Sequence, residues 1–230
     1  MAVGDLLRSI WHLRRRPARE YALIRLTSRD TLFQDDGTTG LDRYPTIFAF
    51  VREALGDGEA LRLLSFGCAT GEEVLSLRRY FPRAHLLGID INPRHIAVAR
   101  ARPDLARDAR VTIEQAGSLR DQPDGAFDAI FCLSVLRRGL LNVGRRDRCD
   151  PHLRFADFDR QIAEFARCLR PGGLLAVRNS NFRLRDASAA GQFEVALRLR
   201  LAPDPGTPLF GPDNRRLADQ AYGEVVFRRV

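Results

Sequence analysis

The sequence has no lysine, so all 37 of its basic residues are arginine, against 29 acidic residues and a formal net charge of +8. Codon usage in a GC-rich genome favours arginine and alanine, which accounts for part of this charge without any binding partner. A nucleic-acid-binding surface needs its cationic residues gathered on one face. Arginines gather in HLRRRPAR and in RRGLLNVGRRDR, but a solvated helix surface is the simpler interpretation of the first group.

Cysteines and long apolar runs are also scarce. The four cysteines show no C-x-x-C pairing, so nothing indicates a disulfide framework, and a reducing compartment fits best. No apolar run is long enough to cross a bilayer, and Asp5 and Arg8 interrupt the first residues before a signal-peptide core develops. We therefore expect a soluble, cytoplasmic protein.

Apolar runs and helix-like segments alternate from Leu61 onward. The runs LRLLSF, AHLLGIDI, ARVTIEQA, GAFDAIFCLSVL and LLAVRNS predict strands. Between them, GEEVLSLRRYF, PRHIAVARAR and ADFDRQIAEFARCLR predict helices, the last ended by PGG. Such alternation is typical of βαβ units in a parallel sheet. Two final runs, GQFEVALRLRLA and YGEVVFRRV, have no helix between them and are expected to pair antiparallel.

The predicted fold class is therefore α/β: a Rossmann-like, seven-stranded, mostly parallel sheet with a C-terminal antiparallel hairpin and helices on both faces. We expect residues 1–58 to form an N-terminal helical extension or lid, and residues 59–230 to form the main domain. Residues 1–30 are basic and amphipathic. The following DGTTG is a loop by composition, and PTIFAFVREAL has apolar residues at helical spacing behind Pro45.

The turn after the first predicted strand is Gly67-Cys68-Ala69-Thr70-Gly71, where open α/β sheets bind ligands. The dinucleotide pattern G-x-G-x-x-G is absent because Ala69 holds its middle position, and a P-loop is excluded because there is no lysine. Glu72 and Glu73 follow at the helix N-terminus, which otherwise attracts anions. Their charge would repel a pyrophosphate, so we expect a ligand with a cationic group and no phosphate.

S-adenosylmethionine meets this description, since it carries a sulfonium, an ammonium, a ribose diol and an adenine. Asp90 ends the second predicted strand, at about the 20-residue separation from the turn that ribose-binding acids show in dinucleotide folds. A carboxylate accepts both hydroxyl hydrogens of a diol. Asp90 could instead cap the helix near Pro93, but Asn92 is better placed for that.

Four motifs in order resemble those of class I S-adenosylmethionine-dependent methyltransferases: LSFGCATGEE, LGIDIN, FDAIFCLSVL and LRPGGLLAV. The resemblance covers about residues 61–179. Its TGEE and the cysteine after FDxI are most similar to the chemotaxis-receptor methyltransferases, the CheR-like group. The resemblance implies an enzyme that transfers a methyl group, with S-adenosylmethionine as cofactor.

The resemblance also implies which residues hold the cofactor. It places the methionine part against the turn residues Gly67, Cys68, Ala69 and Gly71. Glu72 would hold the ammonium, Asp90 the ribose, and Ile91 would pack on the adenine. Relatives carry an acidic residue before the turn, where this chain has Ser65 or Phe66.

Two further pairs follow from the same resemblance. Ser118 and Leu119 match the pair beside the adenine amino group, although many relatives have Asp in place of Ser118. Cys132 and Leu133 line the exit of the fourth strand.

An upstream segment, FQDDGTTGLDRYP, folds over the cofactor as a lid in many relatives. Its candidate contacts are Gln34, Thr39, Arg43 and Tyr44. Arg43 would supply the cationic partner that the cofactor carboxylate otherwise lacks. An ordinary surface loop with Tyr44 packed beneath it is the alternative.

The methyl acceptor is where the chemotaxis-receptor resemblance fails. That group has an arginine–asparagine pair where this chain has Leu133-Ser134-Val135, so methylation of receptor glutamates is not expected. The Asn/Asp-Pro-Pro-aromatic motif of nucleobase amino methylation is absent, and Cys132 follows phenylalanine rather than proline. Direct transfer to a small molecule or glycan remains, most simply to a hydroxyl. An RNA or protein acceptor, or a non-catalytic cofactor-binding role, is the alternative.

The segment RRGLLNVGRRDRCDPHLRFADFD lies on the side of the sheet where an acceptor pocket would form. His152 is the candidate general base, with Asp150 as its partner or substitute. Its arginines suit an anionic or hydroxyl-rich acceptor, and Asn179 and Asn181 could bind acceptor hydroxyls. No metal-ligand spacing is present, so we expect a metal-free site.

Overall fold

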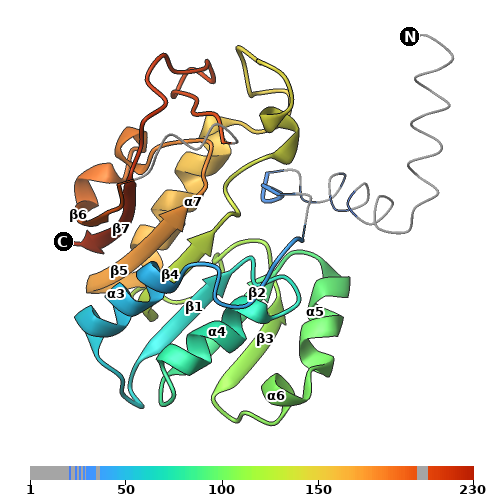
Figure 1. The fold of residues 1–230 in the computed structure, drawn as a ribbon, viewed down its shortest axis with the longest axis vertical. Helices are drawn as coiled ribbons and strands as arrows, with labels where there is room; N and C mark the ends of the chain where they lie inside the picture. Colours follow the sequence, from blue (N-terminus) through green and yellow to red (C-terminus); the bar gives the residue numbers. More distant parts are fainter. Residues whose placement is uncertain are drawn as a thin grey trace, which may run out of the picture.

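The computed structural model describes Tyr21, Ile24, Leu26, Ser28 and residues 30–34, 37–200 and 207–230. The amphipathic helices predicted for residues 1–30 fall almost entirely outside these ranges. The described chain forms one seven-stranded sheet with helices on both faces (Figure 1). Within the same ranges, no helix has the length and apolar character that a membrane span requires.

The sheet confirms the predicted fold class. Its strands are β1 (Arg62–Phe66), β2 (His85–Asp90), β3 (Val111–Gln115), β4 (Phe127–Leu133), β5 (Leu169–Arg178), β6 (Phe193–Arg198) and β7 (Glu224–Arg229). They lie in the order β3-β2-β1-β4-β5-β7-β6. The first five strands are parallel, and β7 is antiparallel to both β5 and β6. The order reverses between β1 and β4, which places a ligand-binding crevice beyond their carboxyl ends.

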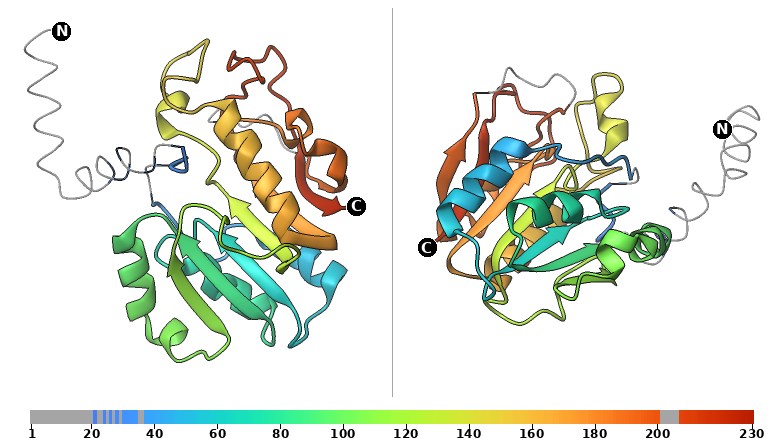
Figure 2. Two further views of the ribbon diagram at one scale, coloured as in Figure 1. Left: turned by 180° about the vertical axis from the view of Figure 1, so that it is seen from behind. Right: turned by 60° about the horizontal axis from the view of Figure 1, so that its bottom comes forward.

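Helices cover the two faces unequally (Figure 2). One face carries α3 (Pro45–Leu55), α4 (Glu72–Tyr80), α5 (Pro93–Ala101) and the short α6 (Pro103–Ala106). The opposite face carries α7 (Phe155–Cys168). The sequence pattern predicted all of these except α6, which was missed, as were three 3-10 turns at Gly139–Asn142, Leu184–Asp186 and Ala190–Gln192. The Asn92 side chain accepts the N–H of Arg94 at 2.9 Å and so caps α5, as expected.

Two hydrophobic cores follow from the alternation of side chains along the strands. Leu63 packs with the α3, α4 and α5 face, whereas its neighbour Leu64 packs with α7. Every residue of β4 is buried, which explains why this strand reads as a continuous apolar run. From α3, the side chains of Ile47 and Phe48 belong to the first core. The division of the chain at residue 58 stays a prediction.

The PGG segment corrects one expectation. Helix α7 ends at Cys168, and Pro171, Gly172 and Gly173 lie inside β5 rather than at the helix end. The β4–β5 register shifts here, from Phe127 opposite Leu169 to Ala129 opposite Leu174. A Cβ on Gly173 would meet the carbonyl oxygen of Arg170 at 2.9 Å. The glycines therefore allow an irregularity in the strand, which composition alone does not distinguish from a helix stop.

The long connection between β4 and α7 is braced by residues 207–222. The N–H of Cys149 donates to the carbonyl of Asn214 at 3.0 Å, and the side chain of Asn214 accepts the N–H of Phe155 at 2.7 Å. The N–H of Arg216 donates to the carbonyl of Asp147 at 2.8 Å. The connection is therefore held in place beyond the carboxyl ends of the central strands.

Candidate active site

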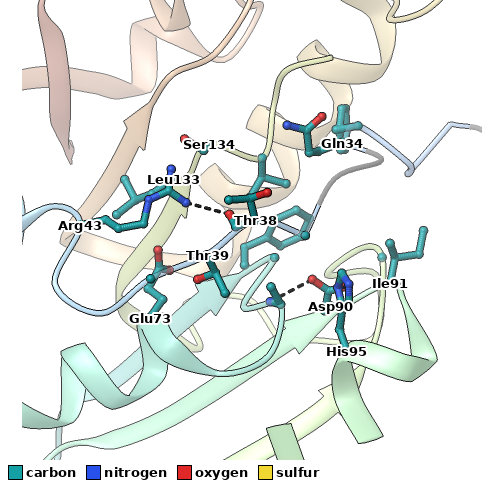
Figure 3. A pocket seen from close by; sticks show the side chains of 18 of the residues that line it. Gln34, Thr38, Thr39, Arg43, Glu73, Asp90, Ile91, His95, Leu133 and Ser134 are labelled. Atoms are coloured by element: carbon teal, nitrogen blue, oxygen red, sulfur yellow. Dashed lines mark hydrogen bonds and ion pairs between the residues drawn. The ribbon is translucent and has the colours of Figure 1, made fainter. Parts of the chain in front are cut away.

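A cavity of about 830 Å3, counted with the open space at its mouth, lies at the carboxyl ends of β1, β2 and β4. Its floor comes from the turn after β1, the ends of β2 and β4, and the loop after β3. The segment that precedes α3 covers it. Figure 3 shows Asp90, Ile91 and His95 at one end and Arg43, Glu73 and Ser134 at the other.

The turn after β1 brings backbone, not side chains, to the cavity. Gly67 and Ala69 both line it, with φ values of 78° and 47°. A Cβ on Gly67 would meet Val135 at 2.5 Å, so only glycine fits there. Ala69 is held in its left-handed conformation because its N–H donates to Asp90 Oδ2 at 3.0 Å.

Asp90 is anchored by polar contacts to three residues. Besides Ala69, its carboxylate accepts the N–H of Asn92 at 2.8 Å through Oδ1. The Nδ1 atom of His95 lies 3.3 Å from the same oxygen. Asp90 is 9% exposed and lines the cavity. Since a carboxylate accepts about four hydrogen bonds, capacity remains for a ligand.

The two glutamates of the turn point in different directions. Glu72 forms an ion pair with Arg102 at 2.8 Å and accepts the hydroxyl of Thr70 at 2.7 Å, and it is not among the cavity-lining residues. Glu73 does line the cavity, and it accepts the hydroxyl of Ser65 at 2.7 Å. Adjacent residues of a helix project about 100° apart, so only one of the pair can face the ligand.

Glu73 is a half-buried acid whose exposed part faces the cavity. Desolvation raises its pKa from 4.5 to about 8, because the hydrogen bond from Ser65 and the charge of Arg43 oppose the burial only in part. Among the described residues, no cation lies close enough to the carboxyl group to offset its burial. The Glu73 carboxyl group also contacts Ser65, which stands at the strand position where relatives have an acidic residue. Glu73 was not among the predicted cofactor contacts, because the sequence does not show which of two adjacent glutamates turns toward the cavity.

The segment before α3 lies over the cavity, and Gln34, Thr39, Arg43 and Tyr44 all line it. The Arg43 guanidinium donates to the carbonyl of Thr38 at 2.9 Å and lies 5.4 Å from the centre of the Tyr44 ring. A Cβ on Gly37 would collide with the His95 ring at 2.2 Å. The segment therefore packs directly on the end that holds Asp90.

A polar cluster that the sequence did not indicate as a unit joins this segment to the ends of β4 and β5. The Tyr44 hydroxyl lies 2.6 Å from the Ser134 hydroxyl, and the Asn179 amide donates to Ser134 at 2.8 Å. Ser134 and Asn179 have φ values of 64° and 52°. Such conformations cost energy in residues other than glycine and concentrate at functional sites.

Several predicted cofactor contacts lie away from the cavity lining: Cys68, Gly71, Glu72, Ser118, Leu119 and Cys132. Cys132 and Leu119 are fully buried in the core on the α7 side. Side chains alternate along β4, so Leu133 lines the cavity while Cys132 points the other way. After β3, Ala116 and Gly117 line the cavity in place of the predicted pair.

The predicted base, His152, lies in a different hollow, which Asp150 and Arg138 also line. Phe33 lines both hollows. Asp150 accepts two hydrogen bonds from Arg148, at 3.0 and 2.9 Å, and these lower its pKa. The structure therefore brings neither His152 nor Asp150 into the cavity that holds Asp90.

The two asparagines after β5 also differ. Asn181 is fully buried, where its side chain accepts the N–H of Arg138 at 2.8 Å and donates to the carbonyl of Pro208 at 2.7 Å. It braces the loops, while Asn179 contacts the cavity-lining pair. Among the described residues, no group of three or more His, Cys, Asp or Glu side chains is placed to hold a metal ion.

Comparisons with known proteins match the part of the chain that builds this cavity. Residues 63–173 match the sequence family described as "Methyltransferase domain". A demethylmenaquinone methyltransferase of Thermus thermophilus is 33% identical over 117 residues, which are 50% of this chain and 46% of that protein. A trans-aconitate 2-methyltransferase of Deinococcus radiodurans is 29% identical over 144 residues, which are 59% of this chain and 46% of that protein. The chain thus spans less than half the length of these relatives.

Among solved structures, a phosphoethanolamine N-methyltransferase 2 of Haemonchus contortus with bound S-adenosyl-L-methionine aligns with a TM-score of 0.45 at 20% identity. The alignment covers 62% of this chain and 29% of that protein.

Proposed function

We propose that the chain is a class I S-adenosylmethionine-dependent methyltransferase, and that it transfers a methyl group from S-adenosylmethionine to an oxygen atom of a small polar acceptor. The finer resemblance to the chemotaxis-receptor group gains no support from the matched proteins.

One observation carries the proposal: the cavity has a carboxyl group at each end, Asp90 and Glu73 (Figure 3). Asp90 suits a ribose diol, because its anchored oxygens still have lone pairs for two hydroxyl hydrogens. Glu73 suits an ammonium, because a cation would stabilise its ionised form at a site that otherwise favours the neutral acid. A ligand with both groups and no phosphate matches this pair.

The other lining residues complete the fit. The left-handed backbone at Gly67 and Ala69 allows a ligand to approach the turn closely. Ile91 offers an apolar surface for the adenine, and Arg43 and Thr39 lie at the covering segment, where Arg43 would pair with the cofactor carboxylate. When bound, S-adenosylmethionine supplies an electrophilic methyl group on its sulfonium. The chain's own task is to orient this group and the acceptor in line and to exclude water.

An oxygen acceptor is supported by the polar character of the Glu73 end, where the Tyr44 and Ser134 hydroxyls line the cavity. The similarity to a trans-aconitate methyltransferase points the same way. A quinone acceptor is the second candidate, favoured by the 33% identity to a demethylmenaquinone methyltransferase. A small polar acceptor and a quinone differ in polarity, so a screen of candidate acceptors distinguishes the two functions.

Isothermal titration with S-adenosylmethionine tests the cofactor assignment. We expect saturable binding, and an absence of binding at millimolar ligand would overturn the proposal. Incubation with methyl-labelled cofactor and a panel of organic acids, sugars and quinones then tests the acceptor. Label in an oxygen-linked methyl supports the proposal, and label only in a quinone ring supports the second candidate.

A further inference from the structure

We propose that Tyr44, Ser134 and Asn179, here called the acceptor triad, bind the methyl acceptor through a deprotonated oxygen, and that the acceptor is a small carboxylic acid. This inference rests on the proposed function and deepens it. The triad joins three distant parts of the chain: the covering segment, the end of β4 and the end of β5.

The three side chains of the acceptor triad all hydrogen-bond to one another. Tyr44 Oη and Ser134 Oγ are 2.6 Å apart, and the Asn179 amide nitrogen lies 2.8 Å from Ser134 and 3.3 Å from Tyr44. Tyr44 and Ser134 line the cavity, whereas Asn179 does not line it and donates to both of their hydroxyls. The amide therefore fixes where the two hydroxyls point.

A count of hydrogens shows what the triad offers to a ligand. The contact between Tyr44 and Ser134 uses one of the two hydroxyl hydrogens, whichever residue donates it. The oxygen that accepts this hydrogen also faces the Asn179 amide, so its accepting capacity is used. Among the described contacts, the second hydroxyl hydrogen has no acceptor. The acceptor triad thus presents a donor to the cavity and selects a ligand oxygen that accepts.

The backbone supports a functional interpretation of this arrangement. Ser134 and Asn179 both have positive φ, at adjacent strand ends. The N–H of Ser134 donates to the carbonyl of Arg178 at 2.8 Å, which ties the two strained positions together. Strain of this kind persists only where the surrounding structure enforces it. Here it turns the two side chains toward Tyr44.

A carboxylate fits the donor. Among the described residues no histidine lies beside the triad to act as a base, and the proposed function assigns Glu73 to the cofactor ammonium. His95 is the histidine that lines the cavity, and it lies against Asp90 at the opposite end, while His152 lies in the other hollow. A carboxylate needs no base: its oxygen forms the new bond to the methyl carbon with its own electron pair while the sulfur–methyl bond breaks, and no proton leaves. One carboxylate oxygen can accept from the triad while the other takes the methyl group.

Binding measurements with S-adenosylhomocysteine, the product that cannot react, test the inference apart from turnover. The probes are trans-aconitate and other small carboxylic acids, each paired with the alcohol of the same carbon skeleton. We expect the wild-type protein loaded with S-adenosylhomocysteine to bind at least one acid more tightly than its alcohol. Tyr44→Phe removes either the hydrogen bond to the charged oxygen or the contact that orients the Ser134 hydroxyl toward that oxygen, so we expect about a 10-fold or greater loss of acid affinity.

Tyr80→Phe is the matched control. Tyr80 also packs on Phe48, with ring centres 5.5 Å apart, and also bonds to the covering segment, through Asp42 at 3.0 Å, but it does not line the cavity. We expect it to leave acid affinity within about 2-fold. Asn179→Gly is a second variant, since glycine tolerates its φ of 52°, and it should weaken acid binding while keeping the affinity for S-adenosylhomocysteine.

The outcomes separate this inference from the proposed function. Binding of S-adenosylhomocysteine without binding of any acid overturns the carboxylate assignment alone, as does methylation restricted to the alcohols. Equal acid affinity in Tyr44→Phe and wild type overturns the acceptor triad. Failure of the wild-type protein to bind S-adenosylhomocysteine overturns both proposals.

Discussion

The two ends of the cavity each hold one carboxyl group, but the protein treats the two groups differently. At one end, Asp90 accepts two backbone N–H groups, from Ala69 and Asn92, at 3.0 and 2.8 Å. At the other end, Glu73 accepts a single hydroxyl, from Ser65 at 2.7 Å, and its pKa rises to about 8. Backbone donors hold an anion in place before any ligand arrives, whereas a desolvated acid becomes an anion only when a cation joins it.

The two ends should therefore contribute differently to binding. The Asp90 end is preorganised, so replacing Asp90 should remove the ligand contact and also disturb the turn that Asp90 holds. At the other end, Glu73 ionises only when the ligand supplies a cation. Replacing Glu73 should therefore remove a charge interaction with the ligand and leave the fold intact. The following predictions test this difference.

Asp90→Ala should have the largest effect. It removes the proposed ribose contact and frees the N–H groups of Ala69 and Asn92. Hydrogen bonds to a charged group contribute roughly 1.5–3 kcal/mol each, so we expect S-adenosylmethionine affinity to fall by at least about 100-fold in isothermal titration. Asp90→Asn keeps one accepting oxygen, so its affinity for S-adenosylmethionine should lie between those of wild type and Asp90→Ala. An unchanged affinity of Asp90→Ala would contradict the ribose assignment.

Glu73→Gln should weaken S-adenosylmethionine binding by about 10-fold, the loss of one charge-assisted hydrogen bond. At pH 7 the free protein holds this carboxyl group protonated, so pairing with an ammonium releases about one proton. Titrations in buffers of different ionisation enthalpy measure that proton, and Glu73→Gln should abolish its release. The control is Glu72→Gln: Glu72 pairs with Arg102 outside the cavity, so its loss should leave both affinity and proton release unchanged. A larger effect from Glu72 would reverse the assignment.

Stability without ligand should depend on pH through Glu73. The pKa of this group is raised in the folded protein, so between about 4.5 and 8 the unfolded chain gives up a proton that the folded chain keeps. The free energy of unfolding should therefore fall as pH rises through this window. Urea denaturation at pH 5, 6.5 and 8 would show a shallower decline in Glu73→Gln than in wild type. Identical slopes would contradict the raised pKa.

His152→Ala should have the smallest effect, because His152 lies outside the cavity and a carboxylate acceptor needs no base. We expect turnover within about 2-fold of wild type and unchanged cofactor affinity. A general base contributes about 100-fold or more. A loss of that size would support the base role predicted from the sequence and would favour a hydroxyl acceptor.

Much of the fold could be predicted because its signals are local. Apolar runs bounded by glycine and proline marked every strand, and helical spacing marked α3, α4, α5 and α7. The prediction failed at Gly172 and Gly173, because glycine permits a helix stop and a strand irregularity equally well. The conformation of the connection between β4 and α7 could not be predicted from local sequence either, because its partner Asn214 lies about 65 residues downstream of Cys149.

Within the site, three features of the sequence predict a diol-binding acid at Asp90 and exclude a phosphate loop: its position after a strand, its spacing from the turn and the absence of lysine. The Glu73 end could not be predicted in this way, because it depends on tertiary packing. The packing of α4 on the sheet sets its rotation, and that rotation turns Glu73 inward and Glu72 toward Arg102. Likewise Tyr44 meets Ser134 across 90 residues of chain, a contact that no local pattern encodes because strand pairing and helix packing bring the two together.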